Sequence, residues 1–113
     1  MDCIFCNIVA GKISTDIVYQ DDEVLAFRDI HPQAPVHLLV IPKKHYTALT
    51  DLAEEDKMLM GHMVTVANQL AGQEGIANSG YRLVVNCGRQ GGQLVPHLHL
   101  HILGGRQLSG QLG

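Results

Sequence analysis

The chain has 113 residues, 46% apolar and 17% charged, a composition typical of a folded protein with one core rather than of a disordered chain. Its formal net charge of −3 gives no support for a nucleic-acid-binding surface. No apolar run approaches the roughly 20 residues that span a bilayer, and Met1-Asp2-Cys3 lacks the basic start of a secretion signal. We therefore expect a single domain over residues 1–113, cytoplasmic in location, with neither a nucleic-acid nor a membrane partner.

The elements expected in chain order are one short helix, five strands and one long helix. The short helix is expected at Phe5–Val9. Runs rich in apolar and β-branched residues predict strands at Ile17–Gln20, Val24–Asp29, His37–Pro42, Arg82–Asn86 and His97–Leu103. Asp21-Asp22 predicts a tight turn, so the first two strands should form a hairpin.

The long helix is expected from about Leu52 to about Ala71. Asp51 and Glu54 resemble a capping box at its start, and Gly72 and Gly75 stand where it should end. Its predicted buried stripe consists of Leu59, Met63, Val66, Ala67 and Leu70. These elements predict an α+β fold, in which helices pack on a five-stranded antiparallel sheet.

The most informative stretch is His97-Leu98-His99-Leu100-His101. On a strand, alternation would place the three histidines on one face and direct Leu98, Leu100 and Ile102 into a core. Three interpretations are open. All three histidines could bind one metal ion, one could be a nucleophile whose neighbours position substrate oxygens, or they could be surface residues without a function.

A glycine-rich loop precedes this stretch. It runs Asn86-Cys87-Gly88-Arg89-Gln90-Gly91-Gly92-Gln93 and could bring backbone N–H groups close to anionic oxygens. It is not a P-loop, because no Gly-Lys-Ser/Thr follows. Together with the histidines, it indicates a phosphate held beside an imidazole.

At these residues the chain resembles the histidine triad (HIT) family, whose signature His-x-His-x-His followed by apolar residues is matched by His97–Leu103. The resemblance extends to Phe5–Ile13, Phe27-Arg28-Asp29-Ile30, His37–His45 and Gly104-Gly105-Arg106. The Ile-Pro-Lys-Lys-His run and the Leu-Gly-Gly-Arg ending are similar to the Hint branch of purine nucleoside phosphoramidases. They are less similar to the Fhit branch of dinucleoside polyphosphate hydrolases.

The resemblance implies that His99 attacks the α-phosphorus and becomes a nucleotidyl-histidine, from which water releases the nucleoside monophosphate. A main-chain carbonyl at His97 would hold one ring nitrogen of His99 as N–H. His101 and His37 would contact the phosphate and assist proton transfer. Residues that correspond to the family's phosphate and substrate contacts are Asn86, Gly92, Gln93 and Leu94, although many relatives carry Ser or Thr at the position of Leu94.

The nucleoside site is implied for the first third of the chain. Asp29 matches the family acid that accepts hydrogen bonds from the ribose hydroxyls. The apolar walls around the purine correspond to Phe5, Ile8, Ile13, Phe27, Ile30 and Leu39.

Cys3-Ile4-Phe5-Cys6 is a second motif. It could be redox-active, although no thioredoxin-like βαβ pattern follows, or it could be two buried thiols. Some bacterial HIT proteins bind zinc at the positions of Cys3, Cys6, His45 and His97, and that resemblance implies a structural zinc here, with no cofactor in the reaction.

The resemblance also implies a homodimer with a continuous ten-stranded sheet, formed by the long helix and the strand ending at Asn86. The expected function is hydrolysis of the P–N bond in adenosine phosphoramidates, with purine nucleotides as substrates. The alternatives are a dinucleoside polyphosphate hydrolase and a nucleotide-binding interaction module with vestigial catalysis.

Overall fold

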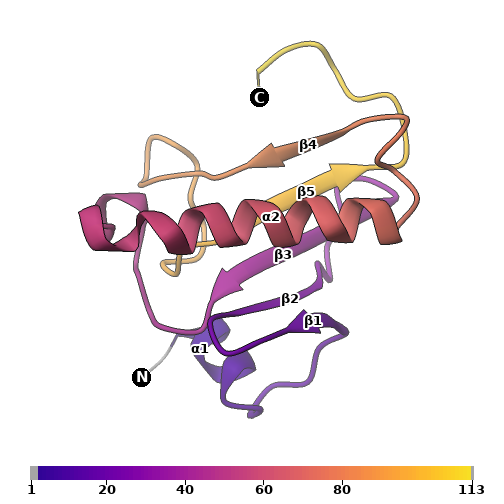
Figure 1. The fold of residues 1–113 in the computed structure, drawn as a ribbon. Helices are drawn as coiled ribbons and strands as arrows, with labels where there is room; N and C mark the ends of the chain where they lie inside the picture. Colours follow the sequence, from indigo (N-terminus) through magenta and orange to yellow (C-terminus); the bar gives the residue numbers. More distant parts are fainter. Residues whose placement is uncertain (1–2, 113) are drawn as a thin grey trace.

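The computed structural model describes residues 3–112 of the chain (Figure 1). Met1, Asp2 and Gly113, the outermost residues of the expected domain, lie outside the described residues. The elements are α1 (Ile4–Val9), β1 (Ile17–Gln20), β2 (Val24–Arg28), β3 (Val36–Pro42), α2 (Lys57–Gln73), β4 (Tyr81–Val84) and β5 (Leu100–Gly104), with short 3-10 turns at Leu49–Asp51 and Glu54–Asp56. No helix within residues 3–112 has the length and apolar character needed to cross a membrane.

The five strands form one antiparallel sheet in the order β1-β2-β3-β5-β4. The expected fold class and the hairpin at Asp21-Asp22 are therefore confirmed. β4, which follows α2 in the chain, lies at one edge of the sheet, and β5 inserts between it and β3 (Figure 1). This insertion brings the histidines of the C-terminal third beside His37 of β3.

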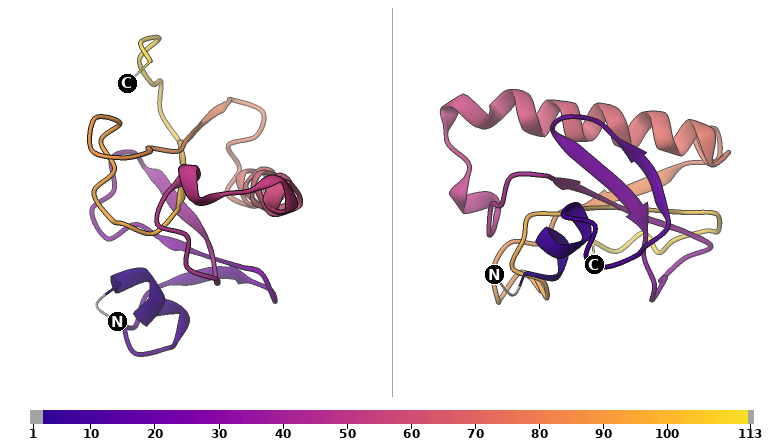
Figure 2. Two further views of the ribbon diagram at one scale, coloured as in Figure 1. Left: turned by 90° about the vertical axis from the view of Figure 1, so that its left-hand side faces the viewer. Right: turned by 90° about the horizontal axis from the view of Figure 1, so that it is seen from below.

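Alternation along the strands separates two cores. Val24, Ala26, Leu38, Val40 and Ile102 pack with α2 on one face of the sheet. Leu25, Phe27, Leu39 and Ile41 pack with α1 on the other face. The two helices thus lie on opposite sides of the sheet (Figure 2). The expected stripe of α2 is buried at Met63, Val66, Ala67 and Leu70, whereas Leu59 is half-buried.

The long helix begins later than expected, at Lys57 instead of Leu52. The expected pairing of Asp51 with Glu54 does not form. The Asp51 carboxylate instead accepts from the Thr47 N–H (2.8 Å), and the Asp56 carboxylate accepts from the Ala53 N–H (2.9 Å). Because these acids stabilise two separate 3-10 turns, regular α-helix starts only after them.

Two strands also differ from expectation. β4 ends at Val84, so Asn86 lies beyond it, and β5 starts at Leu100 instead of His97. The pairing of β5 with β3 ends at Leu100 opposite Val40, and the Leu98 N–H donates to the Tyr46 carbonyl (2.7 Å) instead. Of the three histidines expected on one strand, only His101 lies within it. Alternation nevertheless holds across the whole stretch, because Leu98, Leu100 and Ile102 are all buried in the core under α2.

Candidate active site and metal centre

The face of the sheet opposite α2 carries a row of paired residues. Phe27 of β2 pairs with Leu39 of β3, and Leu39 pairs with His101 of β5. His37 lies two residues before Leu39 and thus on the same face. Over this row lies a cavity of about 550 Å³. Its lining includes Ile4, Phe5, Ile8, Ile13, Phe27, Asp29, Ile30, His37, Leu39, Asn86, Gly92, Leu94, Val95, His99 and His101.

His99 is fixed by the backbone two residues before it. Its Nδ1 lies 2.7 Å from the carbonyl oxygen of His97. A carbonyl only accepts hydrogen bonds, so Nδ1 carries the proton and the neutral ring keeps its lone pair on Nε2. The ring itself is buried, with Phe5 packed edge-on against it at 5.2 Å between centroids. An imidazole in this tautomer is a nucleophile that needs no proton removed before it attacks.

A chain of hydrogen bonds sets the tautomers of His37 and His101 as well. The Gln33 N–H donates to Nδ1 of His37 (3.0 Å), so neutral His37 carries its proton on Nε2. That Nε2 lies 2.9 Å from Nδ1 of His101, which therefore accepts. The remaining proton of His101 is on Nε2, which has no hydrogen-bond partner within residues 3–112. His101 thus offers a free N–H donor in the cavity.

Burial keeps these two rings neutral. It lowers the pKa of His37, although the nearby Asp29 carboxylate opposes the shift. Burial, together with the positive charge that His99 and His37 would carry, lowers the pKa of His101 to about 4. Near neutral pH both rings therefore act as hydrogen-bonding groups with defined donors, and not as fixed cations.

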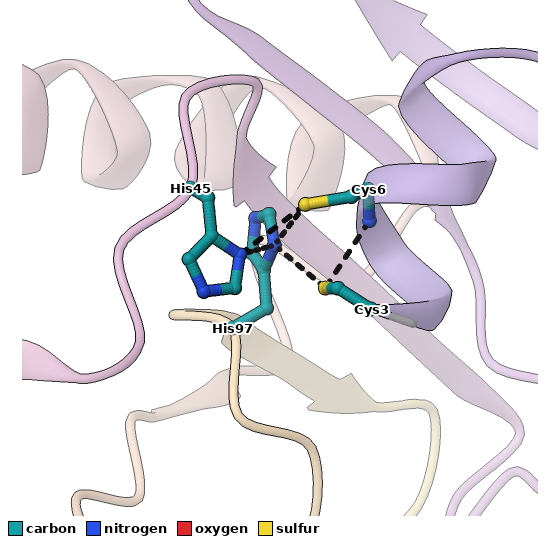
Figure 3. A group of neighbouring side chains, drawn as sticks. All are labelled: Cys3, Cys6, His45 and His97. Carbon is teal, nitrogen blue, oxygen red and sulfur yellow. Dashed lines mark hydrogen bonds between the residues drawn. The ribbon is translucent and has the colours of Figure 1, made fainter. Parts of the chain in front are cut away.

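Four side chains from three parts of the chain form a compact cluster (Figure 3). His97 Nδ1 lies 3.3 Å from Cys3 Sγ and 3.6 Å from Cys6 Sγ, and His45 Nδ1 lies 3.2 Å from both Cys6 Sγ and His97 Nδ1. Bond lengths of about 2.3 Å to sulfur and 2.0–2.1 Å to nitrogen place the ligands of a tetrahedral zinc ion roughly 3.4–3.8 Å apart. The four donor atoms therefore already have nearly the separations that zinc requires.

The surroundings of the cluster also suit a cation. His97 Nε2 donates to the Pro42 carbonyl (2.9 Å), which leaves the Nδ1 lone pair directed at the thiols, and His45 Nε2 lies 3.2 Å from the Thr47 hydroxyl. Burial and the adjacent Cys3 raise the pKa of the Cys6 thiol, because two neighbouring thiolates repel each other. A divalent cation would remove that repulsion. The residues present thus fit the zinc that the family resemblance implies.

A second group of possible ligands, Asp29, His37 and His101, fits a metal poorly. Coordination through Nε2 of His37 would require the proton on Nδ1, where the Gln33 N–H already donates. The interpretation that all three histidines of the motif bind one metal also fails, because Nδ1 of His97 faces the cysteines while His99 and His101 line the cavity.

The glycine-rich loop is held in place by Gln93. The side-chain oxygen of Gln93 accepts from the Gly88 N–H (2.9 Å), and its amide group donates to the carbonyls of Thr47 (2.7 Å) and Val95 (2.9 Å). Gln93 is also absent from the cavity lining, so the structure gives it the role of bracing the loop rather than of contacting a ligand. Asn86 braces the same loop by donating to the Gly91 carbonyl (2.8 Å), yet it lines the cavity, as do Gly92 and Leu94.

The residues expected around a nucleoside all line the cavity. Phe5, Ile8, Phe27 and Leu39 are buried and form its apolar floor, whereas Ile13 and Ile30 are exposed at its rim. The Asp29 carboxylate accepts from the His31 N–H (2.8 Å) and lies 3.4 Å from His37 Nε2. Its remaining lone pairs are available in the cavity.

Sequence reasoning missed several partners because they act through the backbone. The Gln33 N–H and the Pro42 carbonyl fix the tautomers of His37 and His97, and no side-chain pattern marks them. His62, which was not singled out from the sequence, lies 2.6 Å from the Asp21 carboxylate through its side chain and connects α2 to the β1–β2 turn. The sequence feature that could have indicated this contact is the position of His62, next to the buried stripe of α2.

The fold and the histidine cluster together define the histidine triad class. The family model described as HIT domain matches residues 10–108, so the chain belongs to the HIT family. The resemblance expected from the sequence motifs is thereby confirmed. The chain is 51% identical over 111 residues to the purine nucleoside phosphoramidase of Escherichia coli (strain K12), a match that covers 98% of this chain and 93% of that protein.

Solved structures agree with this assignment. A HIT family hydrolase from Legionella pneumophila Philadelphia 1 has a TM-score of 0.96 at 48% identity, over 99% of this chain and 100% of that one. A histidine triad protein from Clostridium difficile has a TM-score of 0.95 at 47% identity, over 99% and 97% of the two chains. The expectation of a histidine triad enzyme is thus confirmed at the level of the family.

Proposed function

We propose that this protein hydrolyses the P–N bond of purine nucleoside phosphoramidates, such as AMP-amines and aminoacyl-AMP, and releases the nucleoside monophosphate. The similarity to a relative named purine nucleoside phosphoramidase supports the substrate class. The single observation that carries the reaction is the 2.7 Å contact between His99 Nδ1 and the His97 carbonyl, because it leaves Nε2 of His99 as a free nucleophile.

The reaction proceeds in two displacements. In the first, Nε2 of His99 forms a bond to the α-phosphorus while the P–N bond breaks, and the leaving amine takes up a proton from the solvent. In the second, water attacks the phosphorus and gives up one proton to the solvent, the bond to Nε2 breaks, and the nucleotide leaves with a new P–O bond. Each step is easier than one direct hydrolysis, because imidazole is both a good nucleophile and a good leaving group.

The neighbouring groups have separate tasks in this scheme. The free N–H on Nε2 of His101 donates to a phosphoryl oxygen, and His37 holds His101 in that tautomer through the 2.9 Å contact. Asp29 receives the ribose hydroxyls, and Phe5 and Phe27 pack against the base. Asn86 and Gly92 face the phosphate from the glycine-rich loop, and Leu94 lines the cavity directly after that loop.

The Cys3, Cys6, His45 and His97 cluster is proposed to hold a structural zinc ion. When bound, zinc would supply a rigid link between the N-terminal segment and the chain that carries His99. It takes no part in the displacement, because the His99 ring faces the cavity and the metal ligands face away from it.

The remaining proposals concern the assembly and location of a single HIT domain over residues 1–113. β4 lies at the edge of the sheet, so its outer side is open to pairing with β4 of a second copy, which would give a ten-stranded sheet. Exposed Val64 of α2 is an apolar contact available to the same dimer. Cys3, Cys6 and Cys87 are all free, which supports a reducing compartment such as the cytoplasm.

A turnover panel tests the function. Adenosine and guanosine phosphoramidates should release AMP and GMP, dinucleoside polyphosphates should be cleaved far more slowly, and His99→Ala should abolish release. Faster cleavage of dinucleoside polyphosphates would favour that alternative activity. Binding of nucleotides without turnover of any substrate would favour an interaction module.

A further inference from the structure

Leu94 is an exposed leucine in an otherwise rigid part of the cavity wall. Its side chain is 91% exposed. A single leucine on a protein surface needs no explanation, but this one lines the same cavity as His99 and His101. Its two neighbours are both fixed: Gln93 by three side-chain hydrogen bonds, and Val95 by packing against the core under α1. Leu94 is therefore held out into solvent rather than left on a mobile segment.

The sheet shows which end of the cavity Leu94 belongs to. One row of paired residues runs from Phe27 on β2 through Leu39 on β3 and His101 on β5 to Val84 on β4. The apolar floor lies at the Phe27 end of this row. Asn86, two residues beyond Val84, binds the loop that presents Leu94. The loop that presents Leu94 is thus attached at the Val84 end of this row, beyond the histidines, while the adjacent Val95 reaches back to the core under α1.

We propose that Leu94 selects the leaving group, by making an apolar contact with the amine or acyl portion of the phosphoramidate. This inference rests on the proposed function, because it assigns the far end of the same site. The nucleoside occupies the Phe27 end and the phosphorus lies at His99, so the group that departs from phosphorus extends toward the loop. An aliphatic or aromatic leaving group would cover the leucine, whereas a cationic one would lose hydration there without gaining a partner. The fixed loop needs no ordering when the substrate binds.

The test compares two adenosine phosphoramidates of equal length, one made from n-pentylamine and one from the isosteric diaminobutane, whose far end is an ammonium. For the wild-type protein, kcat/KM should favour the pentyl compound by about fivefold or more. Leu94→Ala should lower this ratio by about threefold or more, mainly through the pentyl compound. Ile30→Ala is the matched control, because Ile30 is also exposed on the cavity rim but on the nucleoside side. It should lower kcat/KM for both compounds by one common factor and leave their ratio unchanged.

Three outcomes would overturn the inference. The ratio could be equally insensitive to Leu94→Ala and Ile30→Ala, or the wild-type protein could prefer the cationic compound. Light scattering could also show that Leu94→Ala dissociates an oligomer, which would mean that a second copy covers the leucine. Absence of AMP release from both compounds would refute the proposed function itself, whereas release with an unchanged ratio refutes only the role of Leu94.

Discussion

The main-chain oxygen of His97 lies 2.7 Å from Nδ1 of His99, while the ring of the same His97 lies 3.3 Å from Sγ of Cys3. One residue therefore belongs to two sites, through its carbonyl to the proposed nucleophile and through its ring to the cysteine cluster. The ring of His97 is completely buried. Contacts that hold the His97 ring in place therefore also restrict the His97 carbonyl, which sets the tautomer of His99.

Replacement of His99 is expected to abolish turnover. Among residues 3–112, His99 is the only histidine whose Nε2 is left free by a main-chain contact at Nδ1. His99→Ala removes it, so hydrolysis of adenosine phosphoramidate should fall by about three orders of magnitude or more. Nucleotide binding should persist, because the apolar floor and Asp29 remain. Turnover is measured by AMP release, and binding by calorimetry with AMP.

The covalent intermediate provides the control for this prediction. Rapid acid quench and mass spectrometry of the wild-type protein should find the nucleotidyl group on the peptide that contains His99 and at that residue. Its appearance on His97 or His101 would reassign the nucleophile, and near-wild-type turnover of His99→Ala would end the assignment.

Metal content is the second prediction. Protein purified without chelators should contain about one zinc per chain, and the double variant Cys3→Ser/Cys6→Ser should contain none. Because the cluster ties α1 to the segment before β5, loss of the metal should lower the melting temperature more than it lowers turnover. Acid should release the metal, since protons compete for the thiolates and imidazoles.

Cys87→Ser is the matched control for the zinc variant. Cys87 is free and is not part of the four-residue cluster, so this substitution should alter neither metal content nor melting temperature. Metal-free wild-type protein whose stability equals that of the double variant would show that Cys3 and Cys6 serve only in packing.

Much of the fold could be predicted from local pattern. The alternation of Leu98, Leu100 and Ile102 correctly indicated which face of the histidine stretch enters the core. It could not indicate where strand pairing starts, because that depends on β3, whose pairing with β5 ends at Val40 opposite Leu100. An extended chain and a paired strand have the same side-chain period.

The site shows the same division between local and long-range information. The motifs identified most of the residues that line the cavity, because side-chain chemistry is visible in a sequence. They could not indicate that the amide of Gln93 donates to the carbonyl of Thr47, which lies on a loop distant in the sequence. Of the acids that cap the turns before α2, the sequence predicted Asp51, paired with Glu54, but not Asp56. Their actual donors, the N–H groups of Thr47 and Ala53, depend on the path of the loop.

Acid stability should depend on His101. The pKa of His101 is about 4 in the folded protein, against an ordinary value of 6.5. Between about pH 6.5 and pH 4, His101 is therefore protonated in the unfolded chain but neutral in the folded protein. The group therefore lowers stability as pH falls through this range, by about 2–3 kcal/mol in total. His101→Gln should flatten this decline in urea unfolding measured from pH 7 to pH 4.

His31→Gln is the control for that measurement, because His31 is exposed and its ring has no hydrogen bond within residues 3–112. It should leave the pH dependence of the unfolding free energy as in the wild type. An equal slope for all three proteins would contradict the neutral, buried state assigned to His101.

The proposed dimer predicts a mass of about two chains. No strand within residues 3–112 pairs with the outer side of β4, and such an edge is commonly covered in a stable protein. Light scattering at micromolar concentration should therefore report twice the chain mass. A monomer under these conditions would refute the ten-stranded sheet while leaving the single-chain site intact.

The last prediction concerns Asp21, whose carboxylate connects the β1–β2 turn to His62 of α2. The Asp21 carboxylate accepts from Tyr19 (2.7 Å), Glu23 (2.8 Å) and Val24 (2.9 Å), and lies 2.6 Å from His62 Nε2. Burial raises the pKa of Asp21, but these hydrogen bonds outweigh it and hold the pKa far below its ordinary value of 3.8. In Asp21→Asn the side-chain oxygen can still accept hydrogen bonds, but the NH2 group replaces the oxygen that accepts from the Tyr19 hydroxyl and lies beside His62. The substitution should therefore lower the unfolding free energy by about 1–3 kcal/mol at pH 7.

The pH dependence of that cost follows from the lowered pKa. The carboxylate of Asp21 contributes its full stabilisation above the ordinary value of 3.8 and loses it as pH falls toward the folded pKa. The difference between wild type and Asp21→Asn should thus shrink as pH falls below 3.8. Asp22→Asn, at an exposed neighbour with no side-chain hydrogen bond within residues 3–112, should change stability by less than about 0.5 kcal/mol. Equal effects of the two substitutions on the unfolding free energy would mean that the contact of Asp21 with His62 does not stabilise the packing of the hairpin on α2.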